Sequence, residues 1–168
     1  MKVLYLVRHA KSSWEDTSLD DIDRPLKTSG VNDAYMMSDF LKEKKVVPEL
    51  IISSPAVRAI STALIFTNKL KIPTEQIKIL REIYESSPGD ILNKVRMTNP
   101  IVNSLMVFGH DPSLTSLFTL LTGKSLEKIP TSAVASISLS IDEWQKIVPA
   151  AGTLQFLHRP KEIRSMMR

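Results

Sequence analysis

The chain has 168 residues, 43% hydrophobic and 24% charged, which is typical of an ordinary soluble globular protein with one domain, residues 1–168. Its 22 basic and 18 acidic residues give a net charge of +4, without the basic blocks of nucleic-acid-binding proteins, and the absence of cysteine excludes disulfides, thiolate chemistry and cysteine-based zinc sites. Because no apolar run approaches the roughly 18 residues that span a bilayer, and the N-terminal run is too short for a signal peptide, we expect a cytoplasmic protein that does not contact a membrane.

The N-terminal segment predicts a strand, a loop and a helix. Val3–Val7 is a continuous apolar run, which is typical of a strand buried on both faces of a sheet. Residues 10–27 are rich in Ser, Asp and Lys and are expected to form a loop. Apolar residues at helical spacing then predict a helix that Thr28 or Ser29 caps and that runs to about Lys44.

The next segment predicts a second strand, a helix and a short third strand. Leu50–Ser53 is apolar and is expected to be buried. Ser54-Pro55 combines a capping oxygen with a proline suited to the first helical position, so a helix is expected to begin there and to end before Pro73. Ile77–Leu80 is the short strand.

The same cap-and-proline signal recurs twice. Ser87-Pro88 predicts a helix to about Thr98, and Asp111-Pro112 predicts another to about Leu121. Between them, Ser104–Phe108 is a further buried strand.

The C-terminal part changes character. Ala133–Ile141 and Gly152–His158 alternate between apolar and polar residues, as half-exposed strands do, and Pro160–Arg168 is expected to be a solvated helix or tail. The order βαβαβαβαββ predicts a three-layer α/β/α sandwich with a mostly parallel sheet and an antiparallel edge.

Two arginines and two histidines follow the ends of the predicted strands. Arg8 and His9 follow the first strand, Arg58 lies one turn into the helix after the second, and His110 follows the strand at Ser104–Phe108. Because ligands in open α/β sheets bind where the carboxyl ends of strands meet helix N-termini, we expect these four side chains to converge on one crevice.

Three of these residues also have another interpretation when they are taken alone, whereas a charged Arg8 at the end of an apolar strand calls for a phosphate or carboxylate partner. His9 could be a nucleophile, an acid/base, a metal ligand or a polar strand cap. A metal site is only weakly supported, because the chain has three histidines in all and no local cluster of His and Asp. Arg58 could pair with a surface acid, and His110 could be a structural residue of a turn. The combination of all four at strand ends favours a phosphate site.

Such a site predicts phosphoryl transfer through histidine. His9 would attack phosphorus in line with one ring nitrogen, and its other ring nitrogen must donate to a backbone carbonyl or a similar acceptor. Arg8, Arg58 and His110 would neutralise the equatorial oxygens, and water would then cleave the phosphohistidine intermediate. We expect no metal or other cofactor, because the arginines supply the positive field.

The residues around these positions resemble the motifs of the histidine phosphatase superfamily, and most closely those of the SixA-type phosphohistidine phosphatases. The likeness covers nearly the whole chain. The segments that carry it are Leu6-Val7-Arg8-His9-Ala10, Asp23-Arg24-Pro25-Leu26 with Thr28-x-Gly30, Ser53-Ser54-Pro55 with Arg58-Ala59 and Thr62-Ala63, Phe108-Gly109-His110, and Thr131-Ser132-Ala133.

The resemblance implies a phosphoglycerate mutase-like fold and assigns roles to individual residues. It implies that His9 is the nucleophile and that Arg8, Arg58 and His110 form the phosphate pocket. It also implies that Arg24 adds a contact to the phosphate. Without the resemblance, Arg24 would be interpreted as a solvated charge in a loop.

The sequence departs from the superfamily pattern at one position and leaves the proton donor open. Ala10 stands where the pattern has glycine; its methyl group is tolerable if φ is negative, but would narrow the pocket slightly. Larger members take a proton-donating carboxylate from the middle of the chain, which Glu82 roughly matches; the other candidates are Asp16, Asp20 and Asp23. A phosphohistidine substrate needs little acid help, because its N–P bond is weak once the leaving imidazole is protonated.

The leading hypothesis is a monomeric phosphatase that acts on a protein carrying phosphohistidine, such as a phosphotransfer domain, and that holds phosphate in its site. The short chain lacks room for a large capping insertion, which predicts a shallow, open site. The alternatives are a phosphatase of small phosphomonoesters or sugar phosphates and a non-catalytic phosphoprotein-binding module. A mutase is less favoured, because it needs a closed pocket.

Overall fold

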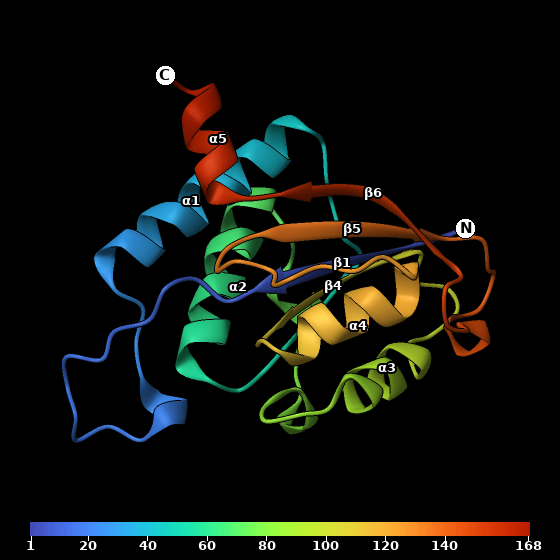
Figure 1. Cartoon of the computed structure of the whole chain (residues 1–168), viewed down its shortest axis with the longest axis horizontal. Helices are drawn as coiled ribbons and strands as arrows, with labels where there is room; N and C mark the ends of the chain where they lie inside the picture. Colours follow the sequence, from blue (N-terminus) through green and yellow to red (C-terminus); the bar gives the residue numbers. More distant parts are fainter.

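The computed structural model describes residues 1–168 and is built on one six-stranded sheet. The strands are β1 (Lys2–Arg8), β2 (Leu50–Ser53), β3 (Ile77–Ile79), β4 (Ser104–Gly109), β5 (Val134–Leu139) and β6 (Gly152–His158). They lie in the order β3-β2-β4-β1-β5-β6 (Figure 1). The first four strands pair in parallel, and β5 runs antiparallel to both β1 and β6. The predicted mostly parallel sheet with an antiparallel edge is therefore confirmed.

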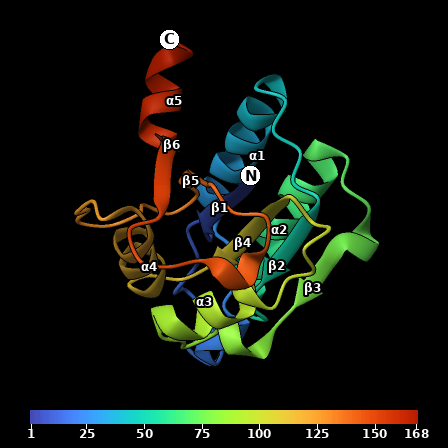
Figure 2. The same cartoon turned by 90° about the vertical axis from the view of Figure 1, so that its right-hand side faces the viewer.

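Helices cover both faces of this sheet (Figure 2). One face carries α1 (Thr28–Glu43), α2 (Val57–Leu70) and α5 (Pro160–Met166), and the other carries α3 (Pro88–Arg96) and α4 (Ser113–Thr122). Each face has its own apolar core, and both faces of β1 and β4 are buried because their side chains alternate between the two cores. This is the predicted three-layer α/β/α sandwich. No helix combines the length and the apolar character needed to cross a bilayer.

The carboxyl ends of β1, β4 and β2 lie at one edge of the sheet. Arg8 at the end of β1 pairs with Gly109 at the end of β4, and the His9 N–H donates to the Gly109 carbonyl at 3.1 Å. Beside them, the Ser54 N–H donates to the Phe108 carbonyl at 3.1 Å. These bonds bring together the three segments that carry the candidate site residues.

The helix starts were predicted with mixed success. Ser87-Pro88 begins α3 as expected. The Ser87 hydroxyl accepts from the Asp90 N–H at 3.1 Å, and the Asp90 carboxylate accepts from the Ser87 N–H at 2.9 Å. The prediction for Ser54-Pro55 is wrong, because α2 begins only at Val57 and its N-terminal cap is Ala56. The Ser54 hydroxyl instead accepts from the Ala56 N–H at 3.1 Å and is engaged in the site described below.

Two further boundaries differ from the predictions. Helix α4 begins at Ser113, so Pro112 precedes the helix instead of opening it. Helix α1 begins at Thr28 with Lys27 in the capping position and without a side-chain cap, so neither Thr28 nor Ser29 caps it. The expected C-terminal helix is present as α5, where Ile163 is buried against the core of α1 and α2.

The loop that precedes α1 is held against the first turn of that helix at Gly30. A Cβ atom on Gly30 would fall on the backbone of Lys11, whose carbonyl also accepts from the Lys27 N–H at 3.0 Å. We expect Gly30→Ala to lower the free energy of unfolding by about 1–3 kcal/mol, because backbone cannot yield to the added methyl group as a side chain can.

Denaturant unfolding of the two glycine-to-alanine variants Gly30→Ala and Gly89→Ala measures this effect. At Gly89, inside α3, an added Cβ meets only the Ser87 hydroxyl at 3.6 Å, which is an ordinary contact. Gly89→Ala is therefore expected to leave stability unchanged or to raise it by about 0.5–1 kcal/mol. Equal stability losses in the two variants would contradict the close approach at Gly30.

Candidate active site

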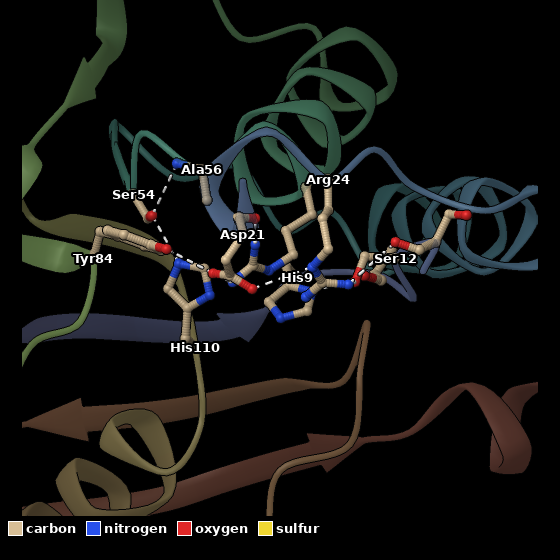
Figure 3. Close-up of polar contacts among 11 residues, drawn as sticks. His9, Ser12, Asp21, Arg24, Ser54, Ala56, Tyr84 and His110 are labelled. Atoms are coloured by element: carbon tan, nitrogen blue, oxygen red, sulfur yellow. Dashed lines mark hydrogen bonds and ion pairs between the residues drawn. The ribbon is translucent and has the colours of Figure 1, made fainter. Parts of the chain in front are cut away.

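The sheet edge described above carries a hollow of about 410 Å³. All five residues that the sequence analysis proposed for the phosphate site line it: Arg8, His9, Arg24, Arg58 and His110. They come from the ends of β1 and β4, from the first loop and from the first turn of α2. The predicted convergence is therefore observed, and Figure 3 shows three of these side chains, His9, Arg24 and His110.

His9 lines this hollow and is nearly buried, with 8% of its surface exposed. Its Nδ1 lies 2.7 Å from the Ala10 carbonyl, which can only accept, so Nδ1 carries the proton and donates it. The lone pair of Nε2 is consequently free to attack an electrophile. Burial lowers the pKa of His9 to about 4, and the charges of Arg58 and Arg8 act in the same direction, so the ring is neutral near pH 7.

Ala10 faces away from the hollow. Its side chain is buried in the core beneath α1 and α2, and its φ is not positive. Its N–H donates to the Thr62 hydroxyl at 2.9 Å, and that hydroxyl donates to the Arg58 carbonyl at 2.7 Å. The expected narrowing of the pocket by the Ala10 methyl group is therefore wrong.

Arg58 and Arg24 are both held by Asp21. The Arg58 Nη2 donates to the Asp21 carboxylate at 3.0 Å and its Nη1 donates to the Asp21 carbonyl at 2.7 Å. The Arg24 Nε donates to the same carboxylate at 3.1 Å, and its Nη1 donates to the Ser12 hydroxyl at 2.8 Å. The Trp14 ring covers the Arg24 guanidinium, whose central carbon lies 3.4 Å from the ring centre. Both arginines are thus fixed before any substrate binds.

His110 is oriented by Ser54. The His110 Nε2 lies 2.7 Å from the Ser54 hydroxyl, which already accepts from the Ala56 N–H. The only other hydrogen bond of this hydroxyl is the one that it accepts, so Nε2 is the acceptor for its proton, and the imidazole proton is then on Nδ1. Burial lowers the pKa of His110 to about 3, and His9 and Arg58 lower it further, so this ring is also neutral. The centres of the two imidazole rings are 5.1 Å apart.

Three buried nitrogens of the site have no hydrogen-bond partner. They are the Arg8 Nε, the Arg58 Nε and the His110 Nδ1, and only three other buried side-chain atoms of the whole chain lack a partner. The Arg8 guanidinium is fixed by a bond of 3.0 Å from its Nη1 to the Ile129 carbonyl. Arg8, Arg58 and His110 line one hollow together with Arg24, and their several N–H donors fit an anion with several oxygens.

The sequence also matches a known protein family. The sequence profile of the histidine phosphatase superfamily (branch 1) matches residues 4–87, half of the chain. The chain belongs to this superfamily. The predicted family is thereby confirmed, and with it the predicted class, a hydrolase that removes phosphoryl groups through a histidine.

Relatives of this histidine phosphatase share most of its length. It is 29% identical over 139 residues to the phosphohistidine phosphatase SixA of Escherichia coli K12, and the aligned region covers 81% of this chain and 84% of SixA. It is 27% identical over 165 residues to an uncharacterized protein of Mycobacterium tuberculosis, which covers 92% of this chain and 100% of that protein. A solved structure of the protein histidine phosphatase SixA complexed with tungstate is 26% identical, with a TM-score of 0.83 over 96% of this chain and 99% of that one.

The carboxylates proposed as proton donors lie outside the hollow of this histidine phosphatase. Glu82 is 52% exposed on its side chain and pairs with Lys94 at 3.0 Å, which lowers the pKa of Glu82 through a hydrogen bond. It lines a different hollow. The loop acids that were the other candidates do not line the His9 hollow either: Asp16, Asp20 and Asp23. The structure brings none of the four to His9, and a proton-donating role for Glu82 stays a prediction.

Asp21, Tyr84 and Trp14 were not found by the sequence analysis. Asp21 was one of several acids in a polar loop, and only its spacing of three residues before Arg24 could have singled it out. Tyr84 reaches Asp21 from 63 residues away, with its hydroxyl donating to the carboxylate at 2.6 Å. No periodicity of the sequence indicates such a contact.

The low pKa values predict that neither site histidine titrates near neutral pH. In the free protein, ring ¹⁵N NMR shifts of His9 and His110 are expected to stay constant from pH 8 down to about 5. Inorganic phosphate adds negative charge beside both rings and is expected to raise both pKa values. His158, on β6 and outside the hollow, serves as the internal control, because its titration should not respond to phosphate. A His9 titration at the ordinary 6.5 would contradict the buried, cation-flanked environment.

Proposed function

We propose that this histidine phosphatase hydrolyses phosphohistidine on proteins through a covalent phosphoryl intermediate on His9. The observation that carries the proposal is the gathering of Arg8, Arg58 and His110 around one hollow with His9, whose Nε2 is free. The two arginines and His110 supply donors from separate side chains, which suits the equatorial oxygens of a phosphoryl group.

The geometry supports a two-step mechanism. Arg8, Arg58 and His110 bind the phosphoryl oxygens, and Arg24 adds positive charge. His9 Nε2 attacks phosphorus as the bond to the leaving group breaks, and the bond from Nδ1–H to the Ala10 carbonyl stabilises the positive charge that develops on the ring. Water then attacks phosphorus, the electron pair returns to Nε2, and the water proton leaves with inorganic phosphate.

A protein substrate fits the open mouth of the hollow. Helix α2 ends at Leu70 and β3 begins at Ile77, so the connection after Arg58 contains no capping segment. Trp14 at the mouth is 71% exposed and is available to a partner surface. The relative named phosphohistidine phosphatase SixA supports the same substrate class. We expect a phosphotransfer domain as partner and a monomeric enzyme in the cytoplasm.

A second candidate function is hydrolysis of small phosphomonoesters such as sugar phosphates. Lys11 and Lys27 line the same hollow, and their ammonium groups suit a second anionic group on a small substrate. A non-catalytic phosphoprotein-binding module would use the same arginines but would not need the free His9 Nε2.

A substrate panel distinguishes these functions. The panel contains a phosphohistidine protein, a phosphoserine peptide and small phosphomonoesters, and the measured quantity is kcat/KM. We expect the phosphohistidine protein to be hydrolysed most efficiently. Equal and very slow release of phosphate from every substrate would contradict the protein-directed function.

A further inference from the structure

Asp21 is one of two carboxylates in a hollow that is lined mainly by basic side chains. Its Oδ1 accepts from the Arg24 Nε at 3.1 Å, and its Oδ2 accepts from the Arg58 Nη2 at 3.0 Å and from the Tyr84 hydroxyl at 2.6 Å (Figure 3). A carboxylate has about four acceptor positions, and three of them are occupied. One position, on Oδ1, therefore stays available to a ligand.

This carboxylate is ionised when the enzyme works. The hydrogen bond from Tyr84 lowers the pKa of Asp21 to about 2, with further contributions from Arg58 and Arg24. Asp21 therefore accepts hydrogen bonds near neutral pH and has no proton to donate. It can attract a positively charged group, and it repels a negatively charged one.

Asp21 is the more exposed of the two carboxylates that line the hollow. Its side chain is 46% exposed, whereas His9 is 8% exposed, so a group that leaves His9 toward solvent can meet Asp21. In-line displacement places the leaving group opposite the attacking His9 nitrogen, which is toward the open mouth. Asp111, the other carboxylate that lines the hollow, is more deeply buried and accepts from both the N–H and the hydroxyl of Thr115.

We propose that Asp21 binds the N–H of the leaving imidazole and thereby selects phosphohistidine over phosphomonoesters. This inference rests on the proposed function and names the residue that recognises the leaving group. The substrate ring binds as an imidazolium, with phosphorus on one nitrogen and a proton on the other, and that N–H donates to Asp21.

The transfer step balances without a proton from the enzyme. A bond forms between His9 Nε2 and phosphorus as the bond from phosphorus to the substrate nitrogen breaks, and the electron pair stays on that nitrogen. The ring keeps its proton on the far nitrogen and departs as neutral imidazole, while Asp21 remains ionised. A phosphomonoester instead has no N–H beside its leaving oxygen, so it gains no hydrogen bond from the Asp21 carboxylate.

The test compares two leaving groups of opposite charge in the Asp21→Asn variant. We measure kcat/KM for a phosphohistidine peptide and for p-nitrophenyl phosphate, whose leaving group is a phenolate. The ratio of kcat/KM for the phosphohistidine peptide to kcat/KM for p-nitrophenyl phosphate is expected to fall about 10- to 100-fold. The reason is that the variant loses a charge-assisted hydrogen bond to the imidazolium of the peptide, whereas p-nitrophenyl phosphate makes no such bond.

Three further variants separate charge recognition from the support of the arginines. Asp23→Asn makes the same charge change in the same 3-10 helix, outside the hollow, and is expected to leave the ratio unchanged. Tyr84→Phe removes one hydrogen bond to Asp21 but keeps its charge, so both substrates should lose activity by a similar factor. Asp21→Glu keeps the charge and is expected to retain the ratio even if both rates fall.

Two results overturn the inference, and they differ from the result that overturns the proposed function. An equal loss for both substrates in Asp21→Asn means that Asp21 only holds the arginines. If the ratio of the two kcat/KM values is as low in Asp21→Glu as in Asp21→Asn, the negative charge at this position does not select the substrate. A wild-type enzyme that does not turn over the phosphohistidine peptide overturns the proposed function itself, before any variant is compared.

Discussion

His9→Ala is expected to lower turnover of a phosphohistidine protein by at least about 10³-fold, because the variant has no nitrogen to accept the phosphoryl group. The arginines that hold the phosphoryl oxygens are unchanged, so the affinity for inorganic phosphate should stay close to that of the wild type. Steady-state kinetics and calorimetric titration with phosphate measure the two quantities separately.

His158→Ala is the matched control for this variant. His158 is the histidine outside the hollow; it stacks on Phe156 with ring centres 4.3 Å apart and contacts Phe40 at 4.9 Å. Its replacement is expected to leave turnover unchanged. Similar losses of turnover in the two variants would indicate a general effect of histidine replacement on the fold and would contradict a specific role of His9.

Arg58→Lys is expected to lower kcat/KM about 10²- to 10³-fold although the charge is kept. A lysine has no Nε–H to offer at the orphaned position, and its single ammonium group cannot bind the Asp21 carboxylate, the Asp21 carbonyl and a phosphoryl oxygen together. Because the lost contact strengthens as charge develops in the transition state, the decrease should lie more in kcat than in KM.

Arg96→Lys provides the matched control for Arg58→Lys. Arg96 also has a buried, unpartnered Nε, and its Nη2 donates to the Ile147 carbonyl at 2.7 Å, but it lies in α3 outside the hollow. Its replacement is expected to lower thermal stability and to leave kcat/KM unchanged. A comparable loss of kcat/KM in both variants would show that Arg58 supports the fold and does not act on the substrate.

The layered fold was predictable because its central strands are short and buried on both faces, and its edge strand β6 alternates between apolar and polar residues. Both patterns can be recognised without knowledge of the partner strands: the apolar run Val3–Val7 predicts β1 (Lys2–Arg8), and the alternating run Gly152–His158 matches β6. The convergence of Arg8, His9 and His110 followed from the same strands, because the ends of parallel neighbours must lie at one edge of a sheet.

The supporting contacts of the site were not predictable, because they depend on tertiary structure. The cap-and-proline signal at Ser54 misled because its hydroxyl pairs with His110 across 56 residues, a use that local preferences cannot reveal. Asp21 is one acid among several in a loop without periodicity, and Tyr84 contacts it across 63 residues from the segment that follows β3. The direction of the Ala10 side chain likewise depends on the bond of its N–H to Thr62 in α2.

Rapid-quench labelling of the wild-type enzyme with a radiolabelled phosphohistidine protein tests the covalent mechanism most directly. The predicted result is a transient, acid-labile and base-stable label that maps to His9, forms as fast as the substrate is consumed and decays at the rate of phosphate release. Release of phosphate without any labelled enzyme, or a label on a residue other than His9, would contradict the mechanism.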